Sequence, residues 1–190
     1  MDGERFLPRV GVTAAGLLLA GAAVLAAAPA AVAATPVDCS TNNLQTAIDN
    51  AAPGATLIVS GTCRGNFTIS KNLTRLGQGT AVLDGQQAGT TLTVSPSAAA
   101  TVADLRITDG NATGISAAGI DNFGTLTLQD ATVSGNTASV LGGGIVTLAT
   151  LTLKDSPVSD DSGGLYGGGI YALSGTVTLD DSVVSNNTAS

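Results

Sequence analysis

The chain has 190 residues, of which 14 are acidic, 7 are basic and none is histidine, so its formal net charge is −7. This acidic balance argues against nucleic-acid partners, which require clustered Lys and Arg, and against electrostatic attachment to anionic lipid. With two cysteines and no histidine, the sequence also lacks the ligands of a zinc site, and we expect neither a metal nor a cofactor.

Residues 1–34 have the pattern of an export signal. Arg5 and Arg9 precede an apolar and small-residue stretch from Val10 to Ala28, and "APAAVAA" then offers small residues at the spacing that a signal peptidase requires. The alternative is a retained membrane anchor, since about 18 apolar residues are just long enough to span a bilayer. The Ala- and Gly-rich composition favours removal. We therefore expect a secreted or cell-surface protein that does not contact a membrane once the signal has been removed.

Residues 35–56 are predicted to form an N-terminal cap that contains one short helix. Asn42 is the expected N-cap, with Gln45 three residues later reaching back in a capping box. Leu44 and Ile48 fall on one face at helical spacing, and a Pro-Gly pair ends the helix. Such a helix would cover the first layer of apolar side chains in the strands that follow.

Cys39 and Cys63 are expected to form a disulfide, because an exported protein folds in an oxidising compartment. The bond would close a loop of about 25 residues and stabilise the fold by roughly 3 kcal/mol on a chain-entropy argument. Two buried thiols are the alternative. The bond would tie the cap to the first turn of strands.

Residues 57–190 consist of short runs rich in β-branched residues that alternate with Gly, Asn, Ser and Asp, which predicts strands separated by turns. In the second half, "GTLTL", "TLTL" and "GTVTL" recur about every 25 residues, each after a Gly-rich run that ends in Ile. Repeats of this length indicate a solenoid, in which each turn buries its apolar face against its neighbours. The expected inward columns are Leu126, Leu151 and Val177; Leu128, Leu153 and Leu179; and Val133, Val158 and Val184.

The glycine runs Gly142–Gly144 and Gly167–Gly169 are expected to form tight corners, where positive φ and the absence of a Cβ allow the backbone to turn. A phosphate-binding loop is disfavoured because no helix and no Lys follow. Calcium-binding repeats are also disfavoured, since no carboxylate falls in register after "GGGI". These glycines are therefore interpreted as structural.

When the repeats are aligned with one another, one position is occupied mainly by Asn and is predicted to form a structural Asn column. Stacked Asn side chains at a bend can hydrogen-bond from turn to turn and to backbone groups that the bend leaves unpaired. Asp161 interrupts the column, and because a buried carboxylate is costly we expect water to reach that corner. The members are Asn111, Asn136, Asp161 and Asn187.

The run "LQTAIDNAAPGATLIVSGTCRGNFTISKNLTRLGQGTAVLDG" and the repeat "GGGIYALSGTVTLDDSVVSNNTAS" resemble exported bacterial proteins of the pectin-lyase-like superfamily. The later repeats are similar to those of polymorphic outer-membrane-protein and adhesin-like chains. The resemblance covers residues 42–190. It implies an all-β, right-handed parallel β-helix, a solenoid of about 25 residues per turn with a short N-terminal capping helix. It implies little about activity, since the same scaffold carries lyases, hydrolases and adhesins.

A polysaccharide lyase or glycoside hydrolase is the catalytic alternative within this resemblance. Polygalacturonase-like members combine Asp residues with a Gly-His-Gly motif, and this chain has no histidine. Pectate-lyase-like members use a calcium-binding Asp cluster and an Arg or Lys base, to which Arg106 with Asp104 and Asp109 is the nearest approach. The pairs Asp160-Asp161 and Asp180-Asp181 are not expected to converge, because alternation sends neighbours to opposite faces. We therefore predict no catalytic residues.

The preferred hypothesis is a non-catalytic surface or extracellular protein that serves as an adhesin-like or structural binding module. Its partner would be a carbohydrate or another cell-surface protein. Tyr166 and Tyr171 flank one glycine turn and are the nearest approach to an aromatic platform for a sugar.

Ice binding is a more remote alternative, suggested by Thr-x-Thr pairs that could form two rows of hydroxyl and methyl groups. Thr is also a good outward strand residue in any sheet. The pairs are Thr91/Thr93, Thr125/Thr127, Thr150/Thr152 and Thr176/Thr178.

The segment "VSNNTAS" at 184–190 matches "VSGNTAS" at 133–139, so the printed sequence stops within a repeat. An uncovered last turn would expose strand edges and apolar side chains such as Val177 and Leu179. We therefore expect either a truncated repeat array or self-association through this turn.

Overall fold

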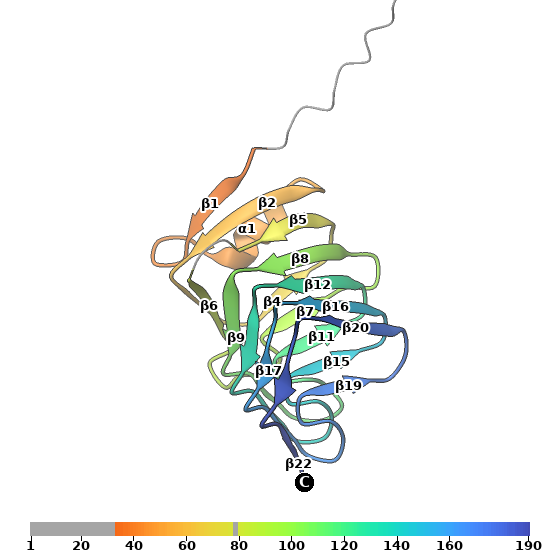
Figure 1. Cartoon of the computed structure of the whole chain (residues 1–190). Coiled ribbons are helices and arrows are strands. Elements are labelled where there is room, and N and C mark those ends of the chain that lie inside the picture. Colours follow the sequence, from red (N-terminus) through yellow and green to blue (C-terminus); the bar gives the residue numbers. More distant parts are fainter. Residues whose placement is uncertain (1–32, 78–79) are drawn as a thin grey trace, which may run out of the picture. The chain divides into compact units, whose positions relative to one another are not determined.

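A computed structural model of the chain describes residues 33–77 and 80–190. The export signal predicted for residues 1–34 lies outside this part, apart from its last two residues. The described chain is a parallel β-solenoid of about six turns with about 25 residues per turn, which confirms the predicted fold class (Figure 1). In the part of the chain that the structure describes, no helix is long and apolar enough to cross a membrane.

Within the described residues, the strands of successive turns stack into four sheets, and the pairings between the named strands are parallel. The seven-stranded sheet contains β1 (Thr35–Asp38), β2 (Ala55–Ser60), β5 (Leu73–Leu76), β8 (Ala99–Ala103), β12 (Thr125–Gln129), β16 (Thr150–Lys154) and β20 (Thr176–Asp180). The six-stranded sheet contains β3 (Thr62–Arg64), β6 (Ala81–Asp84), β9 (Leu105–Thr108), β13 (Thr132–Ser134), β17 (Val158–Ser159) and β21 (Val184–Ser185).

The other two sheets complete each turn. The five-stranded sheet contains β4 (Phe67–Ile69), β7 (Leu92–Val94), β11 (Ile120–Asn122), β15 (Ile145–Thr147) and β19 (Ile170–Ala172). The four-stranded sheet contains β10 (Asn111–Ala112), β14 (Thr137–Ala138), β18 (Ser162–Gly163) and β22 (Thr188–Ala189).

The core consists of like residues stacked from turn to turn. Leu126 pairs in register with Leu151, which pairs with Val177, and Leu128, Leu153 and Leu179 form the next column. The predicted inward columns are therefore confirmed. Each fully buried Leu stabilises the fold by about 1.5–3 kcal/mol relative to an exposed one.

The apolar columns become exposed in the last described turn. Leu153 and Val158 are fully buried, whereas their counterparts Leu179 and Val184 are 47% and 41% exposed. Association of this turn with a second copy of the chain stays a prediction.

Helix α1 (Leu44–Asn50) covers the other end of the core through buried Leu44 and Ile48. The predicted capping box is wrong: the N-cap is Asn43, whose side chain accepts from the Thr46 N–H, and Asn42 lies before it. Gln45 bonds instead to both backbone groups of Thr68 on β4, at 2.7 and 3.1 Å. The amide of Gln45 thus attaches the helix to the edge of the five-stranded sheet.

The glycine runs are explained by close approach more than by backbone angle. In the runs 142–144 and 167–169, only Gly167 has a positive φ, of 55°, so the prediction of positive φ is wrong for the others. A Cβ on Gly143 would lie 2.5 Å from the backbone of Ser162, and one on Gly168 would lie 2.2 Å from the carbonyl oxygen of Thr188. A side chain at these positions would push neighbouring parts of the solenoid apart.

Candidate functional site

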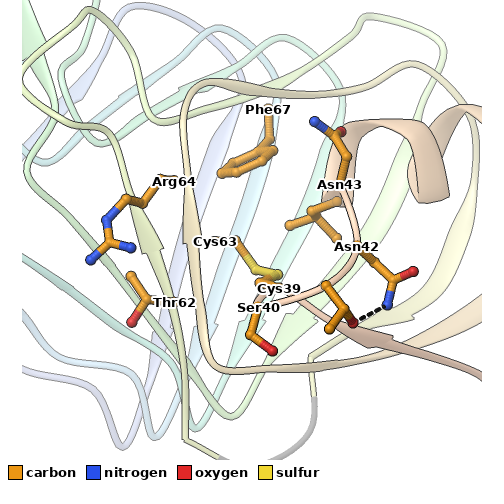
Figure 2. A pocket seen from close by; sticks show the side chains of 10 residues that line it. Cys39, Ser40, Asn42, Asn43, Thr62, Cys63, Arg64 and Phe67 are labelled. Carbon is orange, nitrogen blue, oxygen red and sulfur yellow. Dashed lines mark hydrogen bonds between the residues drawn. A yellow bond between two sulfur atoms is a disulfide. The ribbon is translucent and has the colours of Figure 1, made fainter.

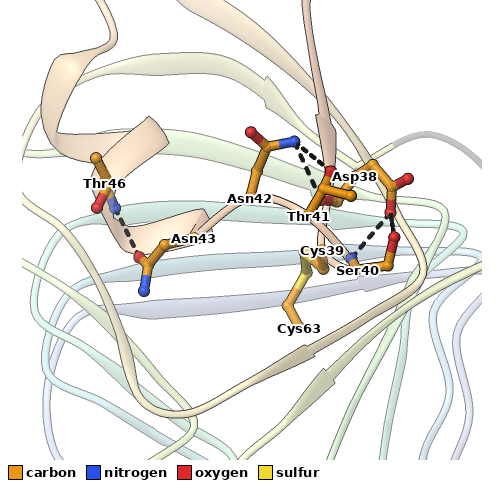
Figure 3. The surroundings of a disulfide bond; sticks show 8 residues. All are labelled: Asp38, Cys39, Ser40, Thr41, Asn42, Asn43, Thr46 and Cys63. Carbon is orange, nitrogen blue, oxygen red and sulfur yellow. Dashed lines mark hydrogen bonds between the residues drawn. A yellow bond between two sulfur atoms is a disulfide. The ribbon is translucent and has the colours of Figure 1, made fainter.

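Cys39 and Cys63 form a disulfide, which confirms the predicted pairing (Figure 3). The bond connects the residue after β1 to the middle of β3, with a Cα–Cα distance of 5.0 Å. Asp38, next to the bond, accepts from the backbone N–H and the hydroxyl of Ser40, and the backbone bond is the larger cause of the lowered pKa of Asp38. These contacts fix the turn that leads into helix α1.

A cavity of about 300 Å³ lies beside the disulfide, and Figure 2 shows the side chains that line it. The charged side chain of its lining is that of Arg64, which is exposed and lies 3.6 Å from a carboxylate oxygen of Asp84. The other contributors are the two cysteines, Thr62, Phe67, Leu44 of helix α1 and the polar residues of the turn before that helix. The lining suits a small polar molecule but brings no carboxylate and base together.

A second cavity, of about 320 Å³, contains two of the three residues considered for a lyase-like site. Asp104 and Arg106 line it together with Asp130, whereas Asp109 does not. Arg106 donates to the hydroxyls of Ser134 and Thr108. Arg106 therefore acts in this cavity as a hydrogen-bond donor to two neighbouring hydroxyls.

The carboxylate of Asp104 forms an ion pair with Arg75. The contact lies on a half-buried surface between two turns, because Asp104 follows β8 and Arg75 lies on β5 of the preceding turn. Asp104 therefore contributes to joining turns as well as lining the cavity.

Sequence reasoning missed a repeated use of Asp at one corner. Four exposed or half-buried Asp residues follow successive strands of the seven-stranded sheet with φ between 46° and 51°. Asp is one of the few residues that adopts this left-handed conformation at low cost. The signal that could have found them is their spacing of one turn, at Asp104, Asp130, Asp155 and Asp181.

The two pairs of neighbouring aspartates differ in burial. Asp160 is exposed with φ of 57°, while Asp161 next to it is buried. Asp180 and Asp181 are both exposed at the end of β20. The difference in burial separates the carboxylates of Asp160 and Asp161, and the expectation for Asp180 and Asp181 stays a prediction.

Asp121 is a further buried carboxylate that the sequence did not single out. It lies on β11, accepts from the Ala117 N–H at 2.8 Å, and also accepts from the Thr90 hydroxyl. Burial raises the pKa of Asp121, and these hydrogen bonds oppose the rise. Its contacts hold the loop before β11 against the sheet.

Three of the four residues predicted for the Asn column form a hydrogen-bonded column in the structure. Asn136 accepts from the Gly110 N–H, Asp161 accepts from the Asn136 N–H, and Asn187 accepts from the Asp161 N–H. Asn111 is not a member: it is exposed on β10 and donates to Gln87. Gly110 holds the position at which the column begins.

Water does not reach Asp161, contrary to the expectation from the sequence. Its exposed fraction is 1%, and its Oδ2 is the buried side-chain polar atom without a hydrogen-bond partner among residues 33–77 and 80–190. Burial raises the pKa of Asp161 to about 6.

The outward side of the seven-stranded sheet carries threonines in register. Thr125, Thr150 and Thr176 pair in one row, and Thr101, Thr127, Thr152 and Thr178 pair in a second. We call these seven residues the threonine face. The predicted pair Thr91/Thr93 is not part of it, because β7 belongs to another sheet and Thr91 is buried.

Tyr166 and Tyr171 lie together, with ring centroids 5.5 Å apart and an angle of 31° between the rings. Tyr166 is 52% exposed. The pair forms a small aromatic surface beside the Gly167 turn.

Comparison of the chain with protein-family models, with curated proteins and with solved structures gives no match. In the described residues, no three Cys, Asp or Glu side chains group as metal ligands would.

Proposed function

We propose that this chain is an exported, non-catalytic β-solenoid whose threonine face binds a repeating, hydroxyl-rich partner, a polysaccharide of a cell surface. The observation that carries the proposal is the unbroken register of the two threonine rows from β12 to β20. Two features support export: residues 1–34 contain an apolar segment preceded by arginines, and the disulfide requires an oxidising compartment to form.

The geometry of the face suits a partner with its own repeat. Adjacent strands lie about 4.8 Å apart and residues two apart along a strand lie about 6.7 Å apart, so the hydroxyls form a regular grid. Each hydroxyl can both donate and accept a hydrogen bond. Many weak, equivalent contacts then add up when the partner presents groups at a similar interval.

The face is rigid because of what lies beneath it. Leu126, Leu128, Leu151 and Leu153 alternate with the threonines along β12 and β16 and are fully buried. A partner therefore meets side chains whose backbone is already ordered, which lowers the entropy cost of binding.

Membership of the pectin-lyase-like superfamily is part of the same proposal and rests on the sequence resemblance together with the parallel solenoid. A lyase or hydrolase of that superfamily is the catalytic alternative, with the Asp104–Arg106 cavity as the place where a sugar acid would bind. Another cell-surface protein is the alternative partner.

The test is binding of the purified chain to insoluble polysaccharides and to polygalacturonate, with product analysis in the presence and absence of calcium. The double variant Thr127→Lys and Thr152→Lys places two long charged side chains in the middle of the face and should abolish binding. The double variant Thr68→Lys and Thr93→Lys is the matched control, because these threonines pair in register on β4 and β7 of another sheet and neither is buried. Equal binding by both variants would refute the proposal, and product formation would favour the lyase or hydrolase.

Ice binding is a second candidate because the same register places hydroxyl and methyl groups in parallel rows free of charged side chains. Lys154 and Asp180 lie beyond the second row, at the ends of β16 and β20. Thermal hysteresis and inhibition of ice recrystallisation by the purified chain, lost in the Thr127→Lys and Thr152→Lys double variant, would support this candidate over polysaccharide binding.

A further inference from the structure

Asp161 is the carboxylate in a column whose other side chains are the amides of buried Asn136 and half-buried Asn187. Its Oδ1 accepts from the backbone N–H of Asn136 at 2.8 Å and from the side-chain amide of Asn136 at 2.9 Å. Its own N–H donates to Oδ1 of Asn187 at 2.9 Å. The remaining atom, Oδ2, is buried and has no hydrogen-bond partner within the described chain.

The two Asn residues of the column show which kind of group occupies the position of Oδ2: a hydrogen-bond donor. The side-chain nitrogen of Asn136 donates to the carbonyl of Ile107 at 3.3 Å, and that of Asn187 donates to the carbonyl of Val158 at 2.9 Å. Val133 pairs in register with both Ile107 and Val158. The equivalent acceptor for Asp161 is therefore the carbonyl of Val133.

The chemistry of this position depends on one proton. A carboxylate has no hydrogen to donate, so an ionised Asp161 would direct an anionic oxygen toward a carbonyl oxygen. A carboxylic acid has an O–H and can donate as the amide of Asn does. The closeness of the turns leaves little room for another group, since a Cβ on Gly144 would lie 2.6 Å from Oδ2.

We propose that Asp161 is a pH switch built into the column: when protonated it donates from Oδ2 to the carbonyl of Val133 and joins its turn to the neighbours, and when ionised it loosens that joint. The step is the loss of one proton from Oδ2 to solvent as the turn opens. The solenoid is then held more tightly in acid than at neutral pH.

The surroundings agree with this assignment. Burial is the main cause that raises the pKa of Asp161 to about 6, and the exposed carboxylate of Asp160 raises it further. The hydrogen bonds from Asn136 and the charge of Arg106 lower it. Arg106 and Asp160 are the charged groups that act on Asp161, and Arg106 is held by the hydroxyls of Ser134 and Thr108.

Hydrogen exchange of the purified full chain at pH 5 and pH 7.5 tests the switch, after correction for the intrinsic pH dependence of exchange. Openings that release Asp161 to water should become roughly 10-fold more frequent at the higher pH, because release restores the usual pKa. The amides of Val133 and Val158 should report this change.

Two variants separate the switch from a general charge effect. Asp161→Asn supplies the donor at every pH, so it should abolish the pH dependence and increase protection at pH 7.5. Asp160→Asn removes the same charge from the adjacent exposed residue and should keep most of the dependence. An Asp161→Asn variant that keeps the wild-type pH dependence, or that is less protected at pH 7.5, would overturn the proposal.

A direct titration covers the case in which the variant does not fold. The carboxyl carbon of Asp161 in the unmodified chain can be followed by nuclear magnetic resonance between pH 3 and pH 8. A midpoint near 6 supports the switch, and a midpoint at or below 4 overturns it.

Discussion

Removal of the disulfide by Cys39→Ala with Cys63→Ala should lower the free energy of unfolding by about 3.5 kcal/mol. The bond spans a sequence separation of 24, and the chain-entropy relation for a loop of this length gives that value at 25 °C. For a domain of this size the loss corresponds to a fall in Tm of roughly 7–14 °C. The physical reason is that the open chain gains conformational freedom mainly in its unfolded state.

Thermal and urea unfolding of the oxidised and the reduced protein measure this effect. Cys63 is buried, so the double variant also loses packing around its sulfur, and the reduced wild-type protein serves as the control for that loss. Reduction should destabilise the wild-type protein and leave the double variant unchanged. Equal unfolding midpoints for oxidised and reduced wild-type protein would show that the bond does not stabilise the fold.

Three further predictions concern the interior. Asn136→Ala should cost about 1–3 kcal/mol, because it leaves the buried Gly110 N–H unpaired, whereas Asn111→Ala on the surface should change stability by less than about 0.5 kcal/mol; urea unfolding compares the two. Leu153→Ala should lower the free energy of unfolding by about 2–5 kcal/mol, and Leu179→Ala, in the same column but 47% exposed, should lower it clearly less. Similar losses for the two variants would mean that the last turn is covered in solution. Folding raises the pKa of Asp161 from 3.8 to about 6, so the contribution of protonated Asp161 to the free energy of unfolding is fully present below about pH 4 and is lost as the pH rises through 6, by about 3 kcal/mol in total. Urea unfolding at pH 4 and pH 7 should show this fall in stability, and the Asp161→Asn variant should not show it.

The stacked strands were predictable because a repeat of about 25 residues carries its own alignment. Residues one turn apart meet by construction, so Leu126, Leu151 and Val177 could be placed in one column from the sequence alone. The same argument failed for Asn111, because the turn before Asn136 is one residue longer than 25. Ile107 pairs in register with Val133, which lies 26 positions later in the chain. The step of 25 therefore pointed to Asn111 where the column holds Gly110.

Interactions between distant segments were the part that local patterns did not reveal. Gln45 fits a capping box three residues after Asn42, but its amide bonds to the backbone of Thr68, which lies 23 positions away. Asp161 looks like an ordinary turn residue in the sequence, because a pattern of polar residues does not distinguish a wet corner from a dry one. Its burial follows from the Gly-lined contact with the adjacent turn.

The corner between β19 and β20 shows where this solenoid accepts a change of length. Ile145 and Ile170 pair at a step of 25, while Thr150 and Thr176 pair at a step of 26, so one extra residue is absorbed between the two strands. Both flanking strands keep their pairing, and the segment that takes up the insertion is exposed at Leu173 and Ser174. A peptide tag or a reporter loop grafted at this corner should therefore be displayed without shifting the alignment of any column, which makes it the natural attachment point for turning the solenoid into a display scaffold.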